Sequence, residues 1–224
     1  MQRVSLHYRP YSAYWIDQVW AISEPESLLS RMTNRLVVAF TGPIGSGKDT
    51  MAERLIAHRG DKMKRFSFAD PLKAMCSLMY DFDRDAYLNR EKKEAVDPYW
   101  GLSPRKAAQD VGSYVRDNFS EDHWVKLLNR RMERWDGDVV ITDLRYDNEA
   151  AYLAGIGALV IRLDPGRRLL ENMPSGSAMA HASEVPISNN FVFAKVDTSV
   201  SPEESFDEVK KIIEDFDYQR SLPI

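Results

Sequence analysis

The sequence predicts an α/β fold in which helices pack on a parallel sheet. Segments that suit strands alternate with segments that suit helices along most of the chain, which is typical of parallel α/β sandwiches. The first strand candidate, RLVVAF at 35–40, is continuously apolar, as in a strand buried on both faces. A glycine-rich loop and then a helix follow it directly, which is the order of a nucleotide-binding α/β domain.

Four further segments continue the strand pattern. KMKRFSF at 62–68 is the second candidate, and DVVITDLR at 138–145 is a buried strand that ends in charge. ALVIRL at 158–163 and FVFAKVD at 191–197 complete the set. These five segments form the expected sheet.

Helix signals occur between the strands. An Asp-Pro pair gives the helix expected at 70–80 an N-cap and a first-turn proline, and Ser-Pro pairs start those at 103–119 and 201–216. Gly112 is expected to weaken the middle of the 103–119 helix. The other expected helices are 48–58 after the glycine-rich loop, the amphipathic segment 121–135, the glycine-terminated segment 148–157 and a charged helix with a loop over 83–100.

Composition narrows the class of protein. The 224 residues suit one domain, or one domain with insertions, and 44% hydrophobic residues are enough for a core. A net charge of −4 argues against a nucleic-acid-coating role. A single cysteine, Cys76, excludes an internal disulfide and a cysteine-only zinc site. No apolar segment approaches the ~20 residues that span a bilayer, and the N-terminus lacks a secretory signal, so we expect a cytoplasmic protein.

Residues 1–34 differ from the remainder. They are rich in Tyr and Trp, show no long period, and allow a short helix over about 25–32. We interpret them as an extension packed on the domain surface, and a partner-binding arm is the alternative. The predicted division is therefore an extension at 1–34 and a catalytic domain at 35–224.

The stretch TGPIGSGKDT has the spacing of a phosphate-binding loop, because four residues separate Gly42 from Gly47 and Lys48 follows. Backbone N–H groups of such a loop point inward and bind phosphate oxygens, and the helix N-terminus adds positive charge. Gly45 and Gly47 allow close approach of the phosphates. Lys48 is placed to bridge the terminal phosphates during transfer.

Asp49 occupies the position that normally holds a Ser or Thr ligand of Mg²⁺. A carboxylate facing phosphates would repel them unless a cation intervened. We therefore predict that Asp49 serves Mg²⁺, directly or through water, and that Thr50 bonds phosphate. The alternative is a carboxylate that interacts only with the helix dipole.

A phosphate loop alone does not name a reaction. A small-molecule kinase also needs a second anion site, because its acceptor carries phosphate, and cations around the transferring group. Arg105 and Arg116 lie about three helical turns apart, roughly on one helix face. Asp143 and Arg145 follow a strand at the sheet edge where ligands bind, and Lys73 lies early in a helix. Each is singly more often a solvated charge, but their shared placement near strand ends favours a site.

The segment 164–185 has the composition of a lid. Arg167 and Arg168 lie at its start, and His181 and Glu184, in HASE, lie near its end. Transfer between phosphates needs no strong base, so lid closure or substrate contacts are favoured over acid–base chemistry for His181.

A family resemblance rests on five segments, which are GPIGSGKDT, FADPLKAM, SPRKAAQDVGSYVRDNFSEDHWVKLL, ITDLRYDNEAAYLAGIGALVIRLDPG and HASE. Together they resemble the deoxynucleoside monophosphate (dNMP) kinases of tailed bacteriophages, over about residues 36 to 216. The resemblance implies transfer of the γ-phosphate of ATP to a dNMP with Mg²⁺, for DNA precursor synthesis in an infected bacterial host. It also implies an adenylate-kinase-like three-layer sandwich with a helical monophosphate-binding insertion, over about 70–135, and a lid.

The resemblance also assigns site residues by position. The ATP site would comprise Gly45, Ser46, Gly47, Lys48, Asp49 and Thr50, and the dNMP site Lys73, Arg105, Gly112, Arg116, Trp124, Asp143, Arg145 and Glu149, with Lys48, Arg116 and Arg145 catalytic. Where the family has a Gly-Thr pair, this chain has Gly112 and Ser113, so a hydroxyl is kept at the second position. The adenine pocket near 190–200, where the family often has Asn, here contains KVDTSV.

Other functions remain open at this stage. Dephospho-coenzyme A kinase and phosphomevalonate kinase share the loop and the fold and differ in their acceptor. A non-catalytic nucleotide-binding module is a further alternative, although it would need no second phosphate site. Small nucleotides are the expected partners, without nucleic acid or membrane, and a homodimer is the expected assembly.

Overall fold

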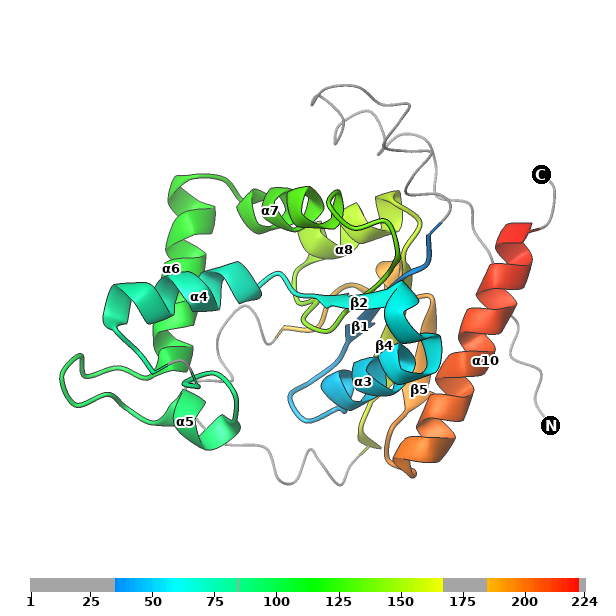
Figure 1. The fold of residues 1–224 in the computed structure, drawn as a ribbon, viewed down its shortest axis with the longest axis horizontal. Coiled ribbons are helices and arrows are strands. Elements are labelled where there is room, and N and C mark those ends of the chain that lie inside the picture. The colour runs from blue at the N-terminus through cyan, green and yellow to red at the C-terminus, as the bar shows by residue number, and fades with distance from the viewer. Residues whose placement is uncertain (1–34, 84, 167–184, 222–224) are drawn as a thin grey trace.

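The sheet is parallel throughout. The computed structural model describes residues 35–83, 85–166 and 185–221, and its five strands are ordered β2-β3-β1-β4-β5. The strands are β1 (Val37–Thr41), β2 (Met63–Phe66), β3 (Asp138–Ile141), β4 (Leu159–Asp164) and β5 (Ala194–Asp197). The predicted parallel α/β fold and all five predicted strands are confirmed (Figure 1).

Helices cover both faces of the sheet because successive β1 side chains point to opposite sides. Val38 and Phe40 belong to one core cluster with α3 (Lys48–Arg59) and α10 (Pro202–Ser221). Val37 and Ala39 belong to another with α7 (His123–Met132) and α8 (Asp147–Gly155). The molecule is therefore a three-layer sandwich, as predicted (Figure 1).

A helical insertion projects beside the sheet. It consists of α4 (Asp70–Tyr80), the short α5 (Arg90–Glu94) and α6 (Pro104–Asn118), seen at the left of Figure 1. Ser103 accepts a hydrogen bond from the backbone N–H of Lys106 and so caps α6 at the predicted Ser-Pro start. The charged segment 83–100 contains one short helix and turns, in line with the predicted helix and loop.

Gly112 does not break α6. The helix is continuous through it, and a Cβ atom there would lie 3.0 Å from Leu72 Cδ2 of α4. The backbone carbonyl of Gly112 also accepts a hydrogen bond from Trp124 Nε1 at 3.3 Å. The glycine thus allows α4 and α6 to pack closely, at the cost in helix propensity that the sequence indicated.

Three strands are shorter than predicted: β5 begins at Ala194 rather than at 191, and two others end early. β3 ends at Ile141 and β2 at Phe66, whereas the sequence suggested strands over 138–145 and 62–68. The cause is the Asp143 carboxylate, which accepts the backbone N–H groups of Phe68 and Ala69 at 3.0 and 2.9 Å. A side chain therefore takes the place of strand-to-strand hydrogen bonds at this edge.

Two helices also depart from their predicted lengths. α7 is shorter than 121–135 and α10 extends beyond 216. The buried side chain of Arg35 donates to the carbonyls of Met132 and Trp135, which satisfies backbone groups at the end of α7. No helix in the described ranges has the length and hydropathy that crossing a membrane requires.

Candidate active site

The phosphate loop connects β1 to α3, as predicted. Its glycines Gly42, Gly45 and Gly47 have φ angles of 142°, 81° and 87°, values that favour residues without a Cβ atom. A Cβ atom on Gly42 would lie 2.4 Å from the carbonyl oxygen of Leu163 in β4. The loop backbone is therefore packed directly against the neighbouring strand, which fixes its position.

Lys48 folds back across the loop. Its Nζ donates to the carbonyls of Gly42 and Pro43 at 2.8 and 2.7 Å, and contacts Ser46 Oγ at 3.2 Å. The ammonium is thus held at the loop by carbonyl oxygens, which are groups that the phosphate oxygens of a nucleotide can replace.

Asp49 lies on the first turn of α3, with 67% of its side chain exposed. Its Oδ1 lies 3.2 Å from Arg65 Nη2 of β2, so the structure gives this carboxylate an ion-pair partner that the sequence did not indicate. Within the described parts of the chain, no group of three or more His, Cys, Asp or Glu side chains could bind a metal. The predicted metal role of Asp49 stays a prediction.

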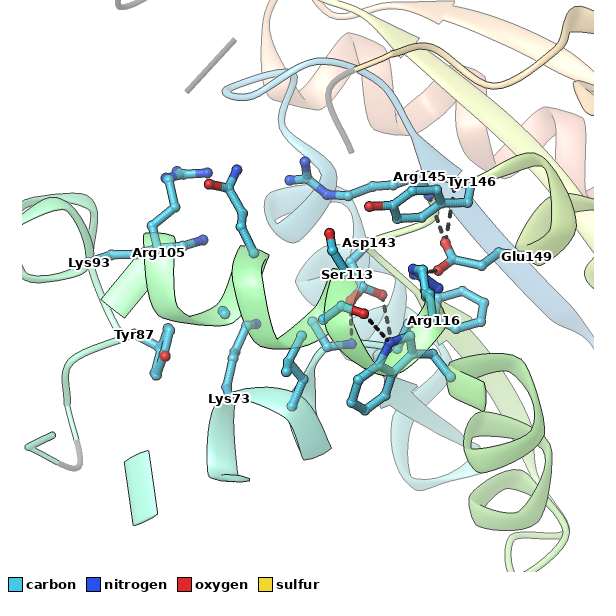
Figure 2. A pocket seen from close by; sticks show the side chains of 17 residues that line it. Lys73, Tyr87, Lys93, Arg105, Ser113, Arg116, Asp143, Arg145, Tyr146 and Glu149 are labelled. Atoms are coloured by element: carbon cyan, nitrogen blue, oxygen red, sulfur yellow. Dashed lines mark hydrogen bonds and ion pairs between the residues drawn. The ribbon is translucent and has the colours of Figure 1, made fainter. Parts of the chain in front are cut away.

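A second element of the site lies at the same sheet edge. Thr41 Oγ1, at the end of β1, donates to the Leu144 carbonyl at 3.1 Å and so joins the loop strand to the segment after β3. Beyond that segment is a pocket between the sheet edge and the helical insertion. It is lined by all eight residues that the resemblance assigned to the dNMP, namely Lys73, Arg105, Gly112, Arg116, Trp124, Asp143, Arg145 and Glu149 (Figure 2).

Arg116 and Glu149 form a buried ion pair in this pocket. Arg116 Nη2 donates to Glu149 Oε1 at 2.7 Å, and the guanidinium lies 3.9 Å from the ring centre of Tyr146. Arg116 Nη1 is buried and has no hydrogen-bond partner among the described residues. Because a buried donor without an acceptor costs free energy, this atom is suited to a ligand oxygen.

Glu149 also starts α8. Its Oε2 accepts the backbone N–H groups of Arg145 and Tyr146 at 3.1 and 3.2 Å. Burial raises the pKa of Glu149 to about 7, with Arg116 opposing the shift and Asp143 adding to it. Both carboxylate oxygens of Glu149 are therefore engaged, by Arg116 and by the start of α8. Its place in the dNMP site stays a prediction.

Asp143 holds the chain between β2 and α4. In addition to the backbone N–H groups of Phe68 and Ala69, it accepts the Ser67 hydroxyl at 2.6 Å. The resemblance placed Asp143 in the dNMP site. The structure places it where it shapes the turn between β2 and α4, and its contact with a ligand stays a prediction.

Trp124 is part of the core as well as of the pocket wall. Only 4% of it is exposed, and its indole N–H bonds to the Gly112 carbonyl. The dNMP contact that the resemblance implies for Trp124 therefore depends on the part of the ring that borders the pocket.

The sequence reasoning assigned no role to four further polar side chains that line the pocket, namely Tyr87, Lys93, Gln109 and Tyr146. Gln109 follows Arg105 by one helical turn and precedes Ser113 by another, so helical periodicity could have found it. Its Nε2 is buried and, in the part of the chain that is described, has no hydrogen-bond partner. Lys93 comes from the charged segment 83–100, where no periodic pattern marked it.

Cations converge at one end of the pocket. Lys73, Lys93 and Arg105 come from three different helices, and Arg145 extends toward them from the sheet edge (Figure 2). Burial, followed by Arg105, Lys73 and Arg145, lowers the pKa of Lys93 to about 8. Mutual repulsion of this kind is relieved by a bound anion, so the pocket has the electrostatics of a phosphate site.

The predicted lid and the predicted adenine region are the remaining parts of the expected site. Arg167, Arg168, His181 and Glu184 are outside the described residues, as is most of the predicted lid. The predicted adenine region is beside the phosphate loop, because Thr198 Oγ1 donates to the Ser46 carbonyl at 3.1 Å.

Comparison with known proteins identifies the family. No family model matches the chain. A protein of Acanthamoeba polyphaga mimivirus, assigned as a deoxynucleotide monophosphate kinase, is 33% identical over 156 residues, which cover 62% of this chain and 80% of the relative. The chain belongs to the deoxynucleotide monophosphate kinase family. The predicted resemblance to dNMP kinases is confirmed.

The chain is also similar in fold to several solved structures. A sugar kinase from Janibacter sp. HTCC2649 has 13% identity, a TM-score of 0.41 and coverage of 80% of this chain and 95% of that chain. TT1252 from Thermus thermophilus has 17% identity, a TM-score of 0.47 and coverage of 81% and 97%. The Mycobacterium tuberculosis APS kinase CysC, solved with AMPPNP and APS, has 19% identity, a TM-score of 0.39 and coverage of 80% and 98%.

Proposed function

We propose that this chain transfers the γ-phosphate of ATP to a deoxynucleoside monophosphate, giving ADP and a deoxynucleoside diphosphate. The observation that carries the proposal is the cation-lined pocket at the sheet edge beside the phosphate loop. A nucleotide-binding regulatory module would need the loop but no second anion site. Membership of the dNMP kinase family supports the same acceptor.

In this proposal the loop binds the donor. Backbone N–H groups from Gly45 to Thr50 and the N-terminus of α3 bind the β- and γ-phosphates. Lys48 exchanges its bonds to the Gly42 and Pro43 carbonyls for phosphate oxygens and neutralises charge as the phosphoryl group moves.

The pocket binds and orients the acceptor. Lys73, Arg105 and Arg145 hold its phosphate, and Arg116 donates through the unsatisfied Nη1 to a substrate oxygen. A phosphate oxygen attacks the γ-phosphorus while the bond to the β–γ bridging oxygen breaks. The monoester is already largely dianionic near pH 7, since its second pKa is about 6, so no strong base is required.

The residues present fit a Mg²⁺ ion that arrives with the nucleotide. Mg²⁺ keeps several waters and takes one or two carboxylates together with substrate phosphates. Asp49 supplies one exposed carboxylate on the first turn of α3, and Thr50 supplies a hydroxyl next to it. These residues would hold the ion, which when bound neutralises charge on the phosphates.

The wider organisation is part of the same proposal. Residues 35–224 form the catalytic domain after the 1–34 extension, with helices over about 70–135 binding the acceptor and a lid over about 164–185. A homodimer and a cytoplasmic location remain predictions, to be measured by light scattering and by cell fractionation.

A coupled assay of ADP release tests the proposed reaction. The protein is incubated with ATP and Mg²⁺ and, in turn, each dNMP, each ribonucleoside monophosphate, dephospho-coenzyme A and phosphomevalonate. We expect turnover with at least one dNMP and formation of its diphosphate. Turnover only with one of the last two acceptors would replace the proposal with that kinase, and tight ATP binding without any acceptor turnover would favour the regulatory module.

A further inference from the structure

Lys93 lies in the pocket wall on α5, outside the segments that carry the family resemblance. We propose that Lys93 is a further ligand of the acceptor's phosphate and that it takes up a proton when a phosphate monoester binds. This inference rests on the proposed function, because it assumes that the pocket holds the acceptor.

The position of Lys93 is set by its neighbour on α5. Glu94 forms an ion pair with Arg105 Nε of α6, which joins the short helix to the insertion. Lys93 is half-buried between these elements, and Figure 2 shows it beside Arg105 on the wall opposite Arg145. Lys73 approaches the same space from α4. By contributing Lys93, α5 adds a positive charge to a cluster that is already positive. This addition has an evident use only if an anion binds there.

Charged and titratable groups from several of the described elements surround Lys93. Arg105, Lys73 and Arg145 face it with positive charge, and Glu94 is the carboxylate that opposes them. Glu94 is already engaged by Arg105, so it compensates Lys93 only in part. Tyr87 also lines the pocket, and burial raises the pKa of its hydroxyl, so it adds no negative charge near neutral pH.

The proton balance follows from these groups. Burial and the three cations lower the pKa of Lys93 to about 8, so roughly half of the amines are neutral at pH 8 in the ligand-free protein. A phosphate dianion next to the amine favours its charged form. The monoester itself is already dianionic at pH 8, since its second pKa is about 6. The proton that Lys93 gains therefore comes from solvent, and its uptake reports Lys93 rather than the ligand.

Calorimetric titration of the full chain with the preferred dNMP tests the inference. Titrations at pH 8 in buffers of different ionisation enthalpy give the number of protons taken up, and we expect roughly half a proton for the wild type. Proton uptake should fall toward zero as the pH is lowered from 8 to 7, because Lys93 is mostly charged at pH 7 before the ligand binds. Above pH 8 the dNMP affinity of the wild type should weaken as Lys93 loses its proton.

Two variants and a matched control isolate the residue. Lys93→Arg keeps a charge that does not titrate in this range, so it should remove the uptake and flatten the affinity above pH 8. Lys93→Gln should remove the uptake and weaken dNMP binding by about tenfold or more, as expected for loss of a charge-assisted hydrogen bond. Lys92→Gln changes the adjacent exposed lysine, which pairs with Asp85, and should match the wild type in both respects.

The outcomes separate this inference from the proposed function. If Lys93→Gln binds the dNMP with wild-type affinity, Lys93 is not a phosphate ligand. If Lys93→Gln keeps the wild-type proton uptake, another group takes up the proton, and the inference is wrong. If the wild type itself binds no dNMP while it binds ATP, the proposed function fails instead. Far-UV circular dichroism of each variant checks that the fold is retained. We expect it to be retained, because Lys93 is only half-buried and lies on a short helix.

Discussion

Glu149 connects the fold to the chemistry at the scale of one residue. It is 1% exposed, it pairs with Arg116, and it accepts two backbone N–H groups at the start of α8. Arg116 in turn stacks on Tyr146 and keeps Nη1 unsatisfied among the described residues. In the proposed reaction, Glu149 is therefore a positioning residue that orients Arg116 toward the acceptor.

We predict that Glu149→Gln raises the KM for the dNMP by about tenfold at pH 8, because the amide cannot hold the guanidinium as an ion pair. With a pKa of about 7, Glu149 gains a proton as the pH falls below neutrality, so the wild-type KM should rise there as well. Steady-state kinetics from pH 6 to pH 9 should show the two profiles converging at acid pH. Parallel profiles would mean that Glu149 acts only on the fold.

The same residue gives a stability readout with a defined sign. The folded-state pKa of Glu149 is raised from 4.5 to about 7, so the native state binds more protons than the unfolded state in this window. The corresponding contribution to stability is present below pH 4.5 and is lost as the pH rises through about 7. The free energy of unfolding of the wild type, measured with urea, should accordingly fall relative to that of Glu149→Gln over this range.

The phosphate loop is the element whose geometry is most tightly constrained. Gly42 has a φ of 142°, and a Cβ atom there would lie 2.4 Å from the Leu163 carbonyl oxygen. Backbone atoms cannot move aside as a flexible side chain can. Substitution at this position must therefore displace either the loop or β4.

We predict that Gly42→Ala lowers stability by about 2 kcal/mol or more and weakens ATP binding, because it combines backbone strain with a backbone clash. Gly155, the last residue of α8, is a matched control because a Cβ atom there would meet nothing within 4 Å. Gly155→Ala should leave stability unchanged or raise it by about 0.5–1 kcal/mol. Thermal unfolding and ATP titration compare the two, and equal effects would contradict the geometric argument.

The helical insertion shows a second use of glycine at this scale. Gly112 brings α4 and α6 close enough for Lys73 of one helix and Arg105 of the other to line one pocket. The sequence indicated only its unfavourable helix propensity. Its benefit depends on Leu72, which lies 40 residues earlier and makes no local pattern with it.

At the scale of the whole molecule, the described residues from Arg35 onward form a hydrophobic core on both faces of the sheet. β1 begins at Val37, and Arg35 is tied to the ends of α7 and α10 through Met132, Trp135 and Arg220. The hydrophobic clusters on both sheet faces are formed by residues between Leu36 and Ile213. We therefore predict that the domain from Arg35 onward folds without residues 1–34.

We predict that a chain starting at Met32 keeps its thermal midpoint within about 4 °C of the full-length value, equivalent to less than about 1 kcal/mol. Its kcat for the dNMP should also be unchanged within about twofold, since the pocket and the loop both lie after Arg35. Scanning calorimetry and the ADP-release assay are the measurements. A large loss of stability would assign the extension to the fold, and a loss of kcat alone would assign it to catalysis.

Much of the architecture could be predicted because it depends on local patterns. The apolar segment before the loop, the glycine spacing and the Asp-Pro and Ser-Pro helix starts act within a few residues of one another, so β1, α3, α4 and α6 were located correctly. The ends of β2 and β3 were not, because Asp143 reaches across 75 residues of chain to bind the backbone of Phe68.

The sequence by itself determined the parallel α/β class and the phosphate loop, and its family resemblance selected eight residues that line one pocket. The tertiary structure decided the strand order β2-β3-β1-β4-β5, the Asp49–Arg65 ion pair and the position of Lys93 beside the other cations of the pocket. The physical reason is range. Propensity and loop geometry act between neighbours in the chain, whereas strand order, ion pairing and the pKa of a half-buried amine depend on which distant segments the core brings together.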